Sequence, residues 1–188
     1  MLLRPGWHWT VVTLCRAGDT DRAPRFHRAM ERLGASGRMA DLDDGPEQTP
    51  LAAEAVQGAL QELLGAEPFD LVLTHGARGE YTRHMRHEEV SRAVAALWLA
   101  GTLHAQELWT FAYEDGGGAH LPRADAAADR RERLPQDVWR NKRSIITNVY
   151  GFGPDSFEAR TTPRVEAFRC FDSAQDLRRR GHNGGDMP

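Results

Sequence analysis

Residues able to do chemistry gather in one short stretch of this sequence, between positions 75 and 87. Within it, His84 and His87 are three residues apart, so at the start of a helix their imidazoles project from neighbouring points of one face. The positive end of a helix disfavours a charged imidazolium, and a neutral imidazole is the form that binds zinc. The spacing therefore raises the hypothesis of a metal site. The competing interpretation is that these histidines cap the helix or lie in solvent.

The elements expected around this stretch are those of a layered α/β protein. Apolar and β-branched runs predict strands over residues 9–14, 38–42, 69–74, 107–113 and 165–171. Apolar positions at helical spacing predict helices over residues 22–33, 50–64, 84–100 and 138–149. Strands that alternate with helices favour a Rossmann-like, mostly parallel sheet with flanking helices. Ligands of such sheets bind beyond the carboxyl ends of the strands, which is where residues 75–83 lie.

Length and composition predict the domain organisation. A chain of 188 residues, 40% of them hydrophobic, is long enough for one α/β domain, expected over residues 1–172. The polar residues 173–188 are expected to form a disordered tail. Residues 114–135 are rich in Gly, Ala, Asp and Arg, and we expect them to form a long loop over the site.

Charge, hydropathy and cysteine usage exclude several classes of protein. The formal net charge of −3 provides no basic field for nucleic acid, so a small-molecule partner is expected. No stretch approaches the ~20 apolar residues of a membrane span, which predicts a soluble, cytoplasmic protein. Cys15 and Cys170 are far apart in the chain, so neither a disulfide framework nor a thiolate metal site is indicated.

A family resemblance adds to this interpretation. Residues 74–90 read T-H-G-A-R-G-E-Y-T-R-H-M-R-H-E-E-V, which resembles the segment of the PIG-L/LmbE-like N-acetylglucosaminyl deacetylase family that ends in its H-x-x-H motif. Further parts agree in order, including E-R-L-G at 31–34, L-D-D-G-P at 42–46 and W-R-N-K at 139–142. The resemblance extends over residues 9–171 and implies the Rossmann-like fold of that family.

The resemblance also implies roles for individual residues. It makes His87 a ligand of Zn²⁺ and His84 the residue that stabilises the tetrahedral intermediate. Tyr81 lies near the position of a tyrosine that contacts the reacting carbonyl in some members, but it is one residue further from the H-x-x-H motif here. His75 is expected to contact the site residues without binding the metal or the substrate itself. The implied reaction removes an acetyl group from an N-acetylated sugar or a related amide.

One half of the family's site has no counterpart in this sequence. The family has an A-H-P-D-D-E type motif after its first strand, which supplies two zinc ligands and a general base. That strand and its helix, about 30 residues, would precede residue 9. A catalytic zinc commonly has three protein ligands, so we expect zinc binding to be weak or absent. Substitution by Asp19, Asp43 or Asp44 remains an alternative.

The missing unit also has structural and functional consequences. In the family that strand lies centrally in the sheet, so its loss predicts unpaired backbone groups and marginal stability. The leading hypothesis is a zinc-dependent deacetylase whose coding region begins further upstream. The alternative is a truncated, non-catalytic homologue that only binds a sugar-like ligand or a partner. A third hypothesis, a nucleotide-binding module, lacks a G-x-G-x-x-G after a strand, and Gly116–Gly118 lie in a loop.

Overall fold

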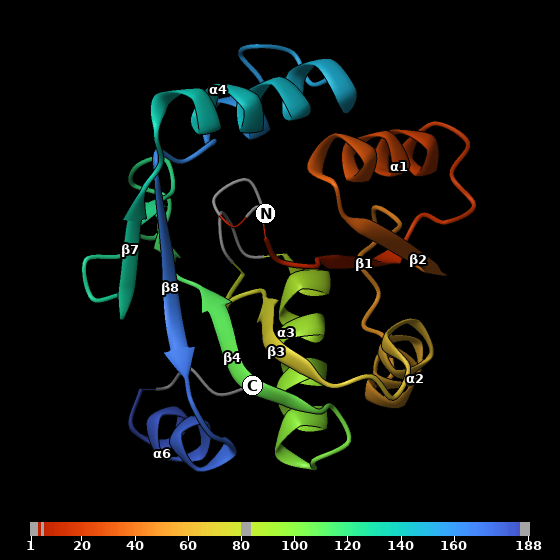
Figure 1. Cartoon of the computed structure of the whole chain (residues 1–188), viewed down its shortest axis with the longest axis vertical. Helices are drawn as coiled ribbons and strands as arrows, with labels where there is room; N and C mark the ends of the chain where they lie inside the picture. Colours follow the sequence, from red (N-terminus) through yellow and green to blue (C-terminus); the bar gives the residue numbers. More distant parts are fainter. Residues whose placement is uncertain (1–3, 5, 80–83, 185–188) are drawn as a thin grey trace. The chain divides into compact units, whose positions relative to one another are not determined.

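The computed structural model describes residues 4, 6–79 and 84–184, with only the backbone for residues 181–184 (Figure 1). Its strands are β1 (Thr10–Cys15), β2 (Ser36–Leu42), β3 (Phe69–Thr74), β4 (Ala105–Phe111), β5 (Tyr113–Glu114), β6 (Arg123–Ala124), β7 (Arg130–Arg133) and β8 (Val165–Phe171). Its helices are α1 (Arg22–Leu33), α2 (Ala53–Leu64), α3 (Met85–Leu99), α4 (Gln136–Ser144), the π-helix η1 (Ile145–Val149), α5 (Phe157–Arg160) and α6 (Ala174–Gly184). The protein therefore has the mixed α/β class expected from its sequence.

Helix bounds follow the local signals closely. Helix α1 has the predicted bounds and ends at Gly34, whose φ of 62° is left-handed. Glycine adopts that conformation without the steric cost of a Cβ. Helix α3 begins after His84, which is its N-cap. No helix in the described part of the chain is both long and apolar enough to cross a membrane.

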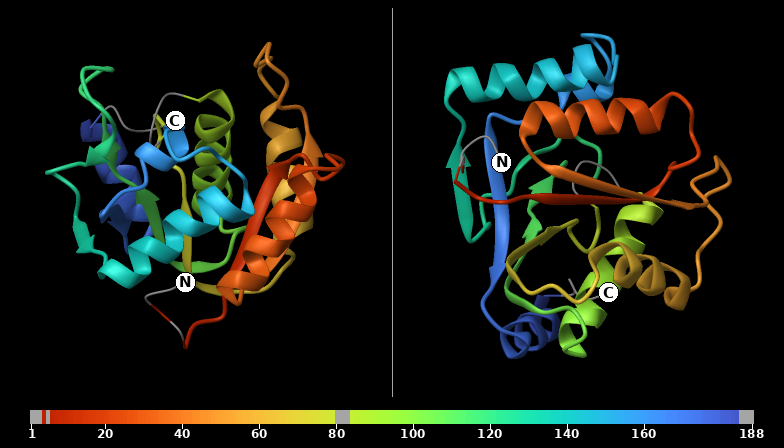
Figure 2. Two further views of the ribbon diagram at one scale, coloured as in Figure 1. Left: turned by 90° about the horizontal axis from the view of Figure 1, so that it is seen from above. Right: turned by 45° about the vertical axis from the view of Figure 1, so that its right-hand side comes forward.

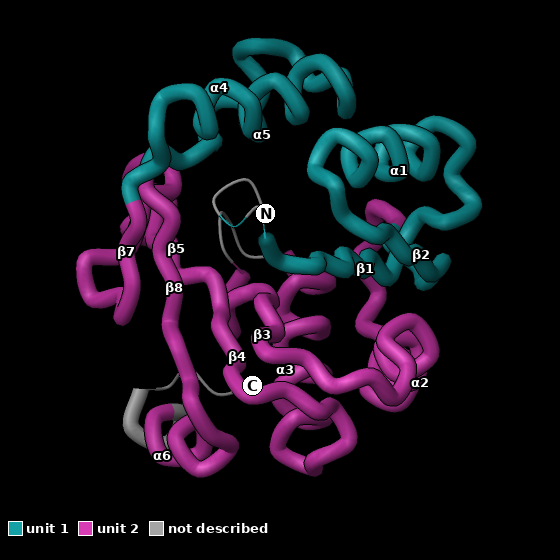
Figure 3. Tube along the Cα trace, viewed as in Figure 1, with its two compact units in different colours: residues 1–44, 133–164 teal, residues 45–132, 165–188 magenta. Residues whose placement is uncertain are grey.

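Residue contacts divide the chain into two compact units, coloured separately in Figure 3. Unit 1 comprises residues 1–44 and 133–164, and unit 2 comprises residues 45–132 and 165–188. Both units are built from segments that are distant in the sequence.

Unit 1 consists of a parallel strand pair and helices. Strands β1 and β2 pair in parallel, with Thr10 opposite Ser36, and α1 lies alongside them (Figure 2). The core of the unit forms where Phe26 and Met30 of α1 pack with Ile145 of η1. The π-helix η1, which directly follows α4, therefore packs against the apolar face of α1.

Unit 2 contains a four-stranded sheet in the order β3-β4-β8-β7. Strand β4 pairs in parallel with β3 and antiparallel with β8. Helix α3 supplies much of the core through Val94, Leu97 and Trp98, which are all buried. Since β3 and α3 are consecutive, the loop between them follows the carboxyl end of β3.

The observed sheets do not confirm the finer expectation of one mostly parallel sheet. In the described residues the strands form three separate sheets, and β8 runs antiparallel to β4. Strand β8 follows α5 in the chain and is not joined to β4 by a single βαβ crossover. It therefore does not have to run parallel to β4. Strand β3 ends its sheet as an edge strand. Its central residues, Leu71 to Leu73, are half-buried and not fully buried as the apolar pattern predicts.

Two further expectations are corrected. Residues 174–184, expected to belong to a disordered tail, form α6. This helix is held by the buried Leu177 and by a hydrogen bond from Arg178 Nη2 to the carbonyl of Leu99. Residues 114–135, expected to form a long loop, contain the last residue of β5 and the whole of β6 and β7. The short strand pairing of Tyr113 with Ala124 closes the hairpin at its base.

Candidate functional site

The structure brings His75, His84 and His87 together. His75 follows the last residue of β3, and its ring stacks on that of His87 with centroids 4.0 Å apart and planes 5° apart. The rings of His84 and His87 have centroids 4.8 Å apart. All three belong to unit 2. The predicted Tyr81 lies outside the described residues.

The start of α3 explains how two of these side chains are held. The His84 backbone is extended, with φ −132° and ψ 122°, and its carbonyl accepts the hydrogen bond of the Glu88 amide at 3.1 Å. Its imidazole makes no capping hydrogen bond to the helix. His84 therefore does not serve as a side-chain cap, which was the plain structural alternative. His87 lies in the first turn of α3.

The His84 imidazole has an unusual environment. Its Nδ1 atom is buried and has no hydrogen-bond partner among the described residues. A buried polar atom left in that state costs roughly 1–3 kcal/mol. Such an atom is normally satisfied by a water molecule or a ligand, so His84 is a natural contact for a bound molecule.

These histidines do not by themselves make a zinc centre. Imidazole binds zinc at about 2.0–2.1 Å, through a lone pair that lies in the plane of the ring. The parallel rings of His75 and His87 therefore cannot both direct a nitrogen at one ion. Over the residues that the structure describes, no group of three or more His, Cys, Asp or Glu side chains could hold a metal ion. The described donors fit at most part of a zinc site.

Two further residues of α3, Arg86 and Glu89, form a buried ion pair that was not predicted from the sequence. Arg86 Nη1 and Glu89 Oε2 form an ion pair at 2.6 Å, with both side chains 6% exposed. Arg86 Nη2 donates to the carbonyl of Thr49 at 2.6 Å, and Glu89 Oε1 accepts from the Leu51 amide at 2.9 Å. This pair ties the segment before α2 to α3. Arg86 therefore has a structural role.

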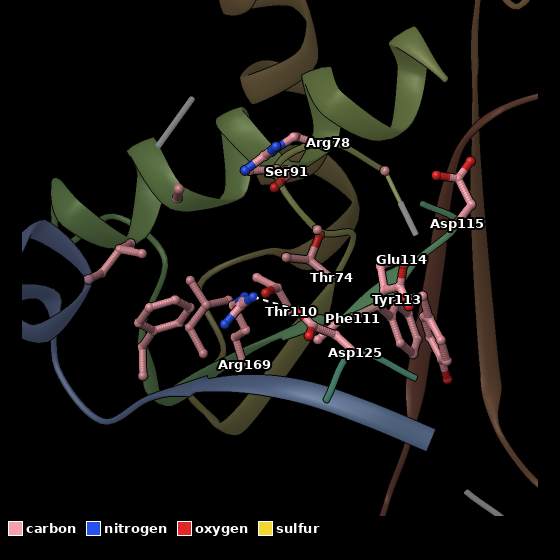
Figure 4. Close-up of a pocket in the computed structure, with 18 of the residues that line it drawn as sticks. Thr74, Arg78, Ser91, Thr110, Phe111, Tyr113, Glu114, Asp115, Asp125 and Arg169 are labelled. Atoms are coloured by element: carbon pink, nitrogen blue, oxygen red, sulfur yellow. Dashed lines mark hydrogen bonds and ion pairs between the residues drawn. The ribbon is translucent and has the colours of Figure 1, made fainter. Parts of the chain in front are cut away.

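A pocket of about 740 Å³ lies in unit 2, and the loop of residues 76–79 after β3 forms part of its lining. Its walls come from β3, α3, β4, β8 and α6 and from the loop between β5 and β6, and Figure 4 shows ten of its residues labelled. Ser91 and Ala95 of α3 line it. His87 lies four residues before Ser91, so it projects from nearly the same face of the helix one turn away. On α3 the lining of the pocket therefore begins one helical turn after His87, and the three described histidines are not among its lining residues.

Glycines shape the loop between β3 and the pocket. A Cβ added at Gly76 would lie 2.8 Å from the Phe111 carbonyl oxygen and 3.0 Å from that of Gly79. The Gly79 amide donates to the Gly76 carbonyl at 3.0 Å, and Gly79 has a φ of 80°. This tight turn needs glycine at both positions. It fixes where the chain leaves β3 and enters the pocket wall.

Charges around the pocket are largely paired. Arg169 Nη2 contacts Asp125 Oδ2 at 2.7 Å. Glu114 Oε1 contacts Arg123 Nε at 2.5 Å. The hydrogen bond from Arg123 is the main cause that lowers the pKa of Glu114, with further help from the charges of Arg123 and His120. Arg169 and Asp125 carried no local sequence signal, because they are 44 residues apart.

Comparisons with known proteins give one useful likeness. No family model matches this chain, and no curated protein matches it. The chain is similar in structure to GalB, the 4-carboxy-2-hydroxymuconate hydratase from Pseudomonas putida KT2440, with 14% sequence identity and a TM-score of 0.50. The match covers 90% of this chain and 86% of the hydratase. At this identity the likeness concerns the fold alone.

Proposed function

We propose that this chain is a PIG-L/LmbE-like protein that hydrolyses an amide of a small molecule, with an N-acetylated sugar as the model substrate. The observation that carries the proposal is the convergence of His75, His84 and His87 at the end of β3, with a buried, unsatisfied Nδ1 on His84. Imidazole side chains are suited to proton transfer during addition of water to a carbonyl. The proposal extends the family resemblance of residues 74–90.

Each histidine has a different role in this proposal. His84 contacts the reacting group, because its open nitrogen can exchange a hydrogen bond with the substrate or with the attacking water. His87 is the residue that the resemblance assigns to Zn²⁺. His75 stacks on the His87 ring and so restricts its orientation. Tyr81 stays a candidate contact of the carbonyl on the strength of the resemblance alone.

Zinc enters the proposal only with donors from outside the described residues. At most two of the described histidines can contribute, and a catalytic zinc commonly has three protein ligands.

A second candidate is a protein of the same fold that binds a ligand without catalysis. The observation that favours it is the lack of a three-donor metal group in the described part of the chain. Hydration of a carbon–carbon double bond is a further reaction to assay, because the structurally similar protein from Pseudomonas is a hydratase. The non-catalytic protein would form no product, and a hydratase would form an alcohol and not a free amine.

The test measures amine release and zinc binding in one set of variants. The purified chain, with and without added Zn²⁺, is incubated with N-acetylglucosamine, and free amine is detected by fluorescence. His84→Ala and His87→Ala are compared with His104→Ala, which alters an exposed histidine outside the cluster. Zinc content is measured by equilibrium dialysis.

The expected result is amine release that both cluster variants lose and His104→Ala retains. Any zinc that the chain binds, which we expect to be weakly held, should be lost only in His87→Ala. Full activity in His87→Ala would refute the assignment. Binding of N-acetylglucosamine without amine release would favour the non-catalytic candidate.

A further inference from the structure

The hairpin of β5 and β6 has a base that is held by strand pairing and a tip that is not. At the base, Tyr113 pairs with Ala124 and Glu114 pairs with Arg123. Residues 115–122 form the tip, and in the described chain they belong to no strand. The conformation of the tip therefore depends on its turns and on the contacts of its side chains.

Three consecutive glycines make the tip adaptable. Gly116, Gly117 and Gly118 have φ values of 64°, 72° and 88°, a left-handed conformation that costs glycine little. A run of such residues changes conformation more easily than a run of residues with side chains. A Cβ added at Gly116 would lie 2.9 Å from Nε2 of His120. The His120 imidazole therefore packs directly against the backbone of the tip.

Glu114 connects the tip to the base of the hairpin. Its Oε1 atom contacts Nε of Arg123 at 2.5 Å. Its Oε2 atom accepts the hydrogen bond of the Gly116 amide at 3.0 Å and contacts Nε2 of His120 at 3.3 Å. The carboxylate of Glu114 is thus shared between one residue of β6 and two residues of the tip.

The two ring nitrogens of His120 both face oxygen atoms that can only accept hydrogen bonds. Nδ1 lies 2.9 Å from the carbonyl oxygen of Leu121, and Nε2 lies beside the carboxylate of Glu114. A neutral imidazole has one N–H group, so one of its nitrogens would direct a lone pair at an oxygen. The imidazolium form carries a proton on each nitrogen and suits both contacts. The closed tip therefore favours a protonated His120.

The other charged groups around the hairpin are carboxylates and guanidinium groups. On the hairpin and on the elements beside it they belong to Glu114, Asp115, Arg123, Asp125, Arg169 of β8 and Arg78. The hydrogen bond from Arg123 is the main cause that lowers the pKa of Glu114. Carboxylates and guanidinium groups ordinarily titrate below about pH 5 or above about pH 12, whereas the ordinary pKa of histidine is about 6.5. A change in the charge of the hairpin near neutral pH therefore comes from His120.

The tip also forms part of the wall of the pocket of about 740 Å³. Residues 112–118 line this pocket without a gap. Figure 4 shows Tyr113, Glu114 and Asp115 along one side of it. A movement of the tip therefore changes the pocket wall.

We propose that Glu114 and His120 form a pH-dependent clasp, which holds the hairpin tip in the pocket wall when His120 is protonated and releases it when His120 is neutral. The tip is closed below about pH 6 and opens more often above about pH 7, the range in which histidines ordinarily titrate. The base stays paired at both pH values, because the contact of Glu114 with Arg123 and the strand pairing do not involve His120. The clasp goes beyond the proposed function and does not depend on it, since it controls the shape of the pocket and not the reaction.

The experiment measures hydrogen exchange of single amides by NMR at about pH 5.5 and about pH 7.5, on either side of the ordinary histidine titration. Rates are corrected for the intrinsic effect of pH on exchange. The amides of Gly116, Gly117 and His120 report on the tip, because they donate to the Glu114 carboxylate and to the side chain and carbonyl of Asp115. The ¹⁵N chemical shifts of the His120 ring report its protonation.

Two variants and two controls complete the design. His120→Gln and Glu114→Gln each remove the charge from one side of the clasp. His104→Gln is the matched control, because it changes an exposed histidine outside the hairpin. The Asp125 amide, which donates to the carbonyl of Ala112 at 3.0 Å, is the internal control for the base of the hairpin.

We expect the protection of the tip amides in the parent chain to fall by about 2- to 5-fold from the lower to the higher pH, as for loss of one partly exposed ion pair. The Asp125 amide should stay protected, and His104→Gln should respond like the parent chain. Both clasp variants should show the lower protection at either pH. If Glu114→Gln also exposes the Asp125 amide, His120→Gln decides alone.

Three results would each overturn the proposal. They are constant protection of the tip in the parent chain, a pH response retained in His120→Gln, and a fall in protection when the pH is lowered. Amine release is not a readout of this experiment, so its outcome leaves the proposed hydrolysis to its own test.

Discussion

Two kinds of buried polar group share the first turns of α3, and their difference separates structure from function. Arg86 and Glu89 are almost fully buried, pair with each other and hold the chain at Thr49 and Leu51. His84, at the start of the same helix, has a buried Nδ1 with no partner among the described residues. Arg86 and Glu89 form their hydrogen bonds with the protein's own groups, whereas Nδ1 of His84 can still form one with a bound molecule.

The comparison teaches that burial alone does not identify a site. Protein interiors satisfy nearly all of their polar groups, so a closed pair such as Arg86 and Glu89 indicates a structural anchor. An open polar atom stays costly until something binds to it. Thr74 and Ser91 are buried residues of the same unit that line its pocket.

Breaking the closed pair should give the largest loss of stability. Glu89→Ala leaves the Arg86 guanidinium buried without its carboxylate and removes the acceptor of the Leu51 amide. We expect the free energy of unfolding to fall by about 3–5 kcal/mol. Urea denaturation monitored by circular dichroism measures this change.

Glu62→Ala, on the exposed side of α2, is the control and should change stability by less than about 0.5 kcal/mol. The double variant Arg86→Met with Glu89→Leu removes both charges and should recover most of the loss. Similar stabilities for Glu89→Ala and Glu62→Ala would show that the pair does not anchor the helix.

A partly exposed anchor should show a smaller and pH-dependent effect. Asp129 Oδ2 accepts from the Cys170 amide at 2.9 Å and from Arg180 Nη2 at 2.6 Å. Desolvation alone would raise the pKa of Asp129, but the hydrogen bonds from Arg180 and Cys170 and the charges of Arg180 and Arg169 together lower it. We expect Asp129→Asn to cost about 1–2 kcal/mol at pH 7, mostly from the weakened hydrogen bonds.

Because the pKa of Asp129 is lowered on folding, its contribution is complete above the unfolded pKa of about 3.9 and is lost as the pH falls through the folded value. The stability difference between Asp129→Asn and the parent should therefore shrink in urea titrations below about pH 4. Burial raises the pKa of the Cys170 thiol to about 11, with a contribution from Asp129. Faster alkylation of Cys170 in the variant is a second readout, and an unchanged rate would argue against the contact.

Removing the open histidine should have the smallest effect on stability. His84→Leu replaces an unsatisfied buried nitrogen by apolar atoms, so the free energy of unfolding should change by no more than about 0.5 kcal/mol or should rise. Thermal unfolding of the variant beside the parent chain measures it. A loss of several kcal/mol would mean that His84 stabilises the fold as Glu89 does. The proposed difference between His84 and the Arg86–Glu89 pair would then be wrong.

Much of the local structure could be predicted because its causes are local. The apolar run of residues 69–74, the helical spacing of residues 22–33 and Gly34 at its end specify β3, α1 and the α1 cap. The positions of His84 and His87 at the start of α3 follow from the same kind of signal. The tail was predicted less well, since α6 depends on burial of Leu177, and that burial needs a surface formed elsewhere in the chain.

The sequence by itself determined which residues could do chemistry: the histidines after β3, their spacing and the family that they resemble. Only the tertiary structure decided that His75 stacks on His87, that Arg86 closes on Glu89, and that Thr74, Thr110 and Arg169 form one row. The physical reason is pairing between distant segments. A row across three strands depends on register, and a shift of one residue would turn each side chain to the other face of the sheet.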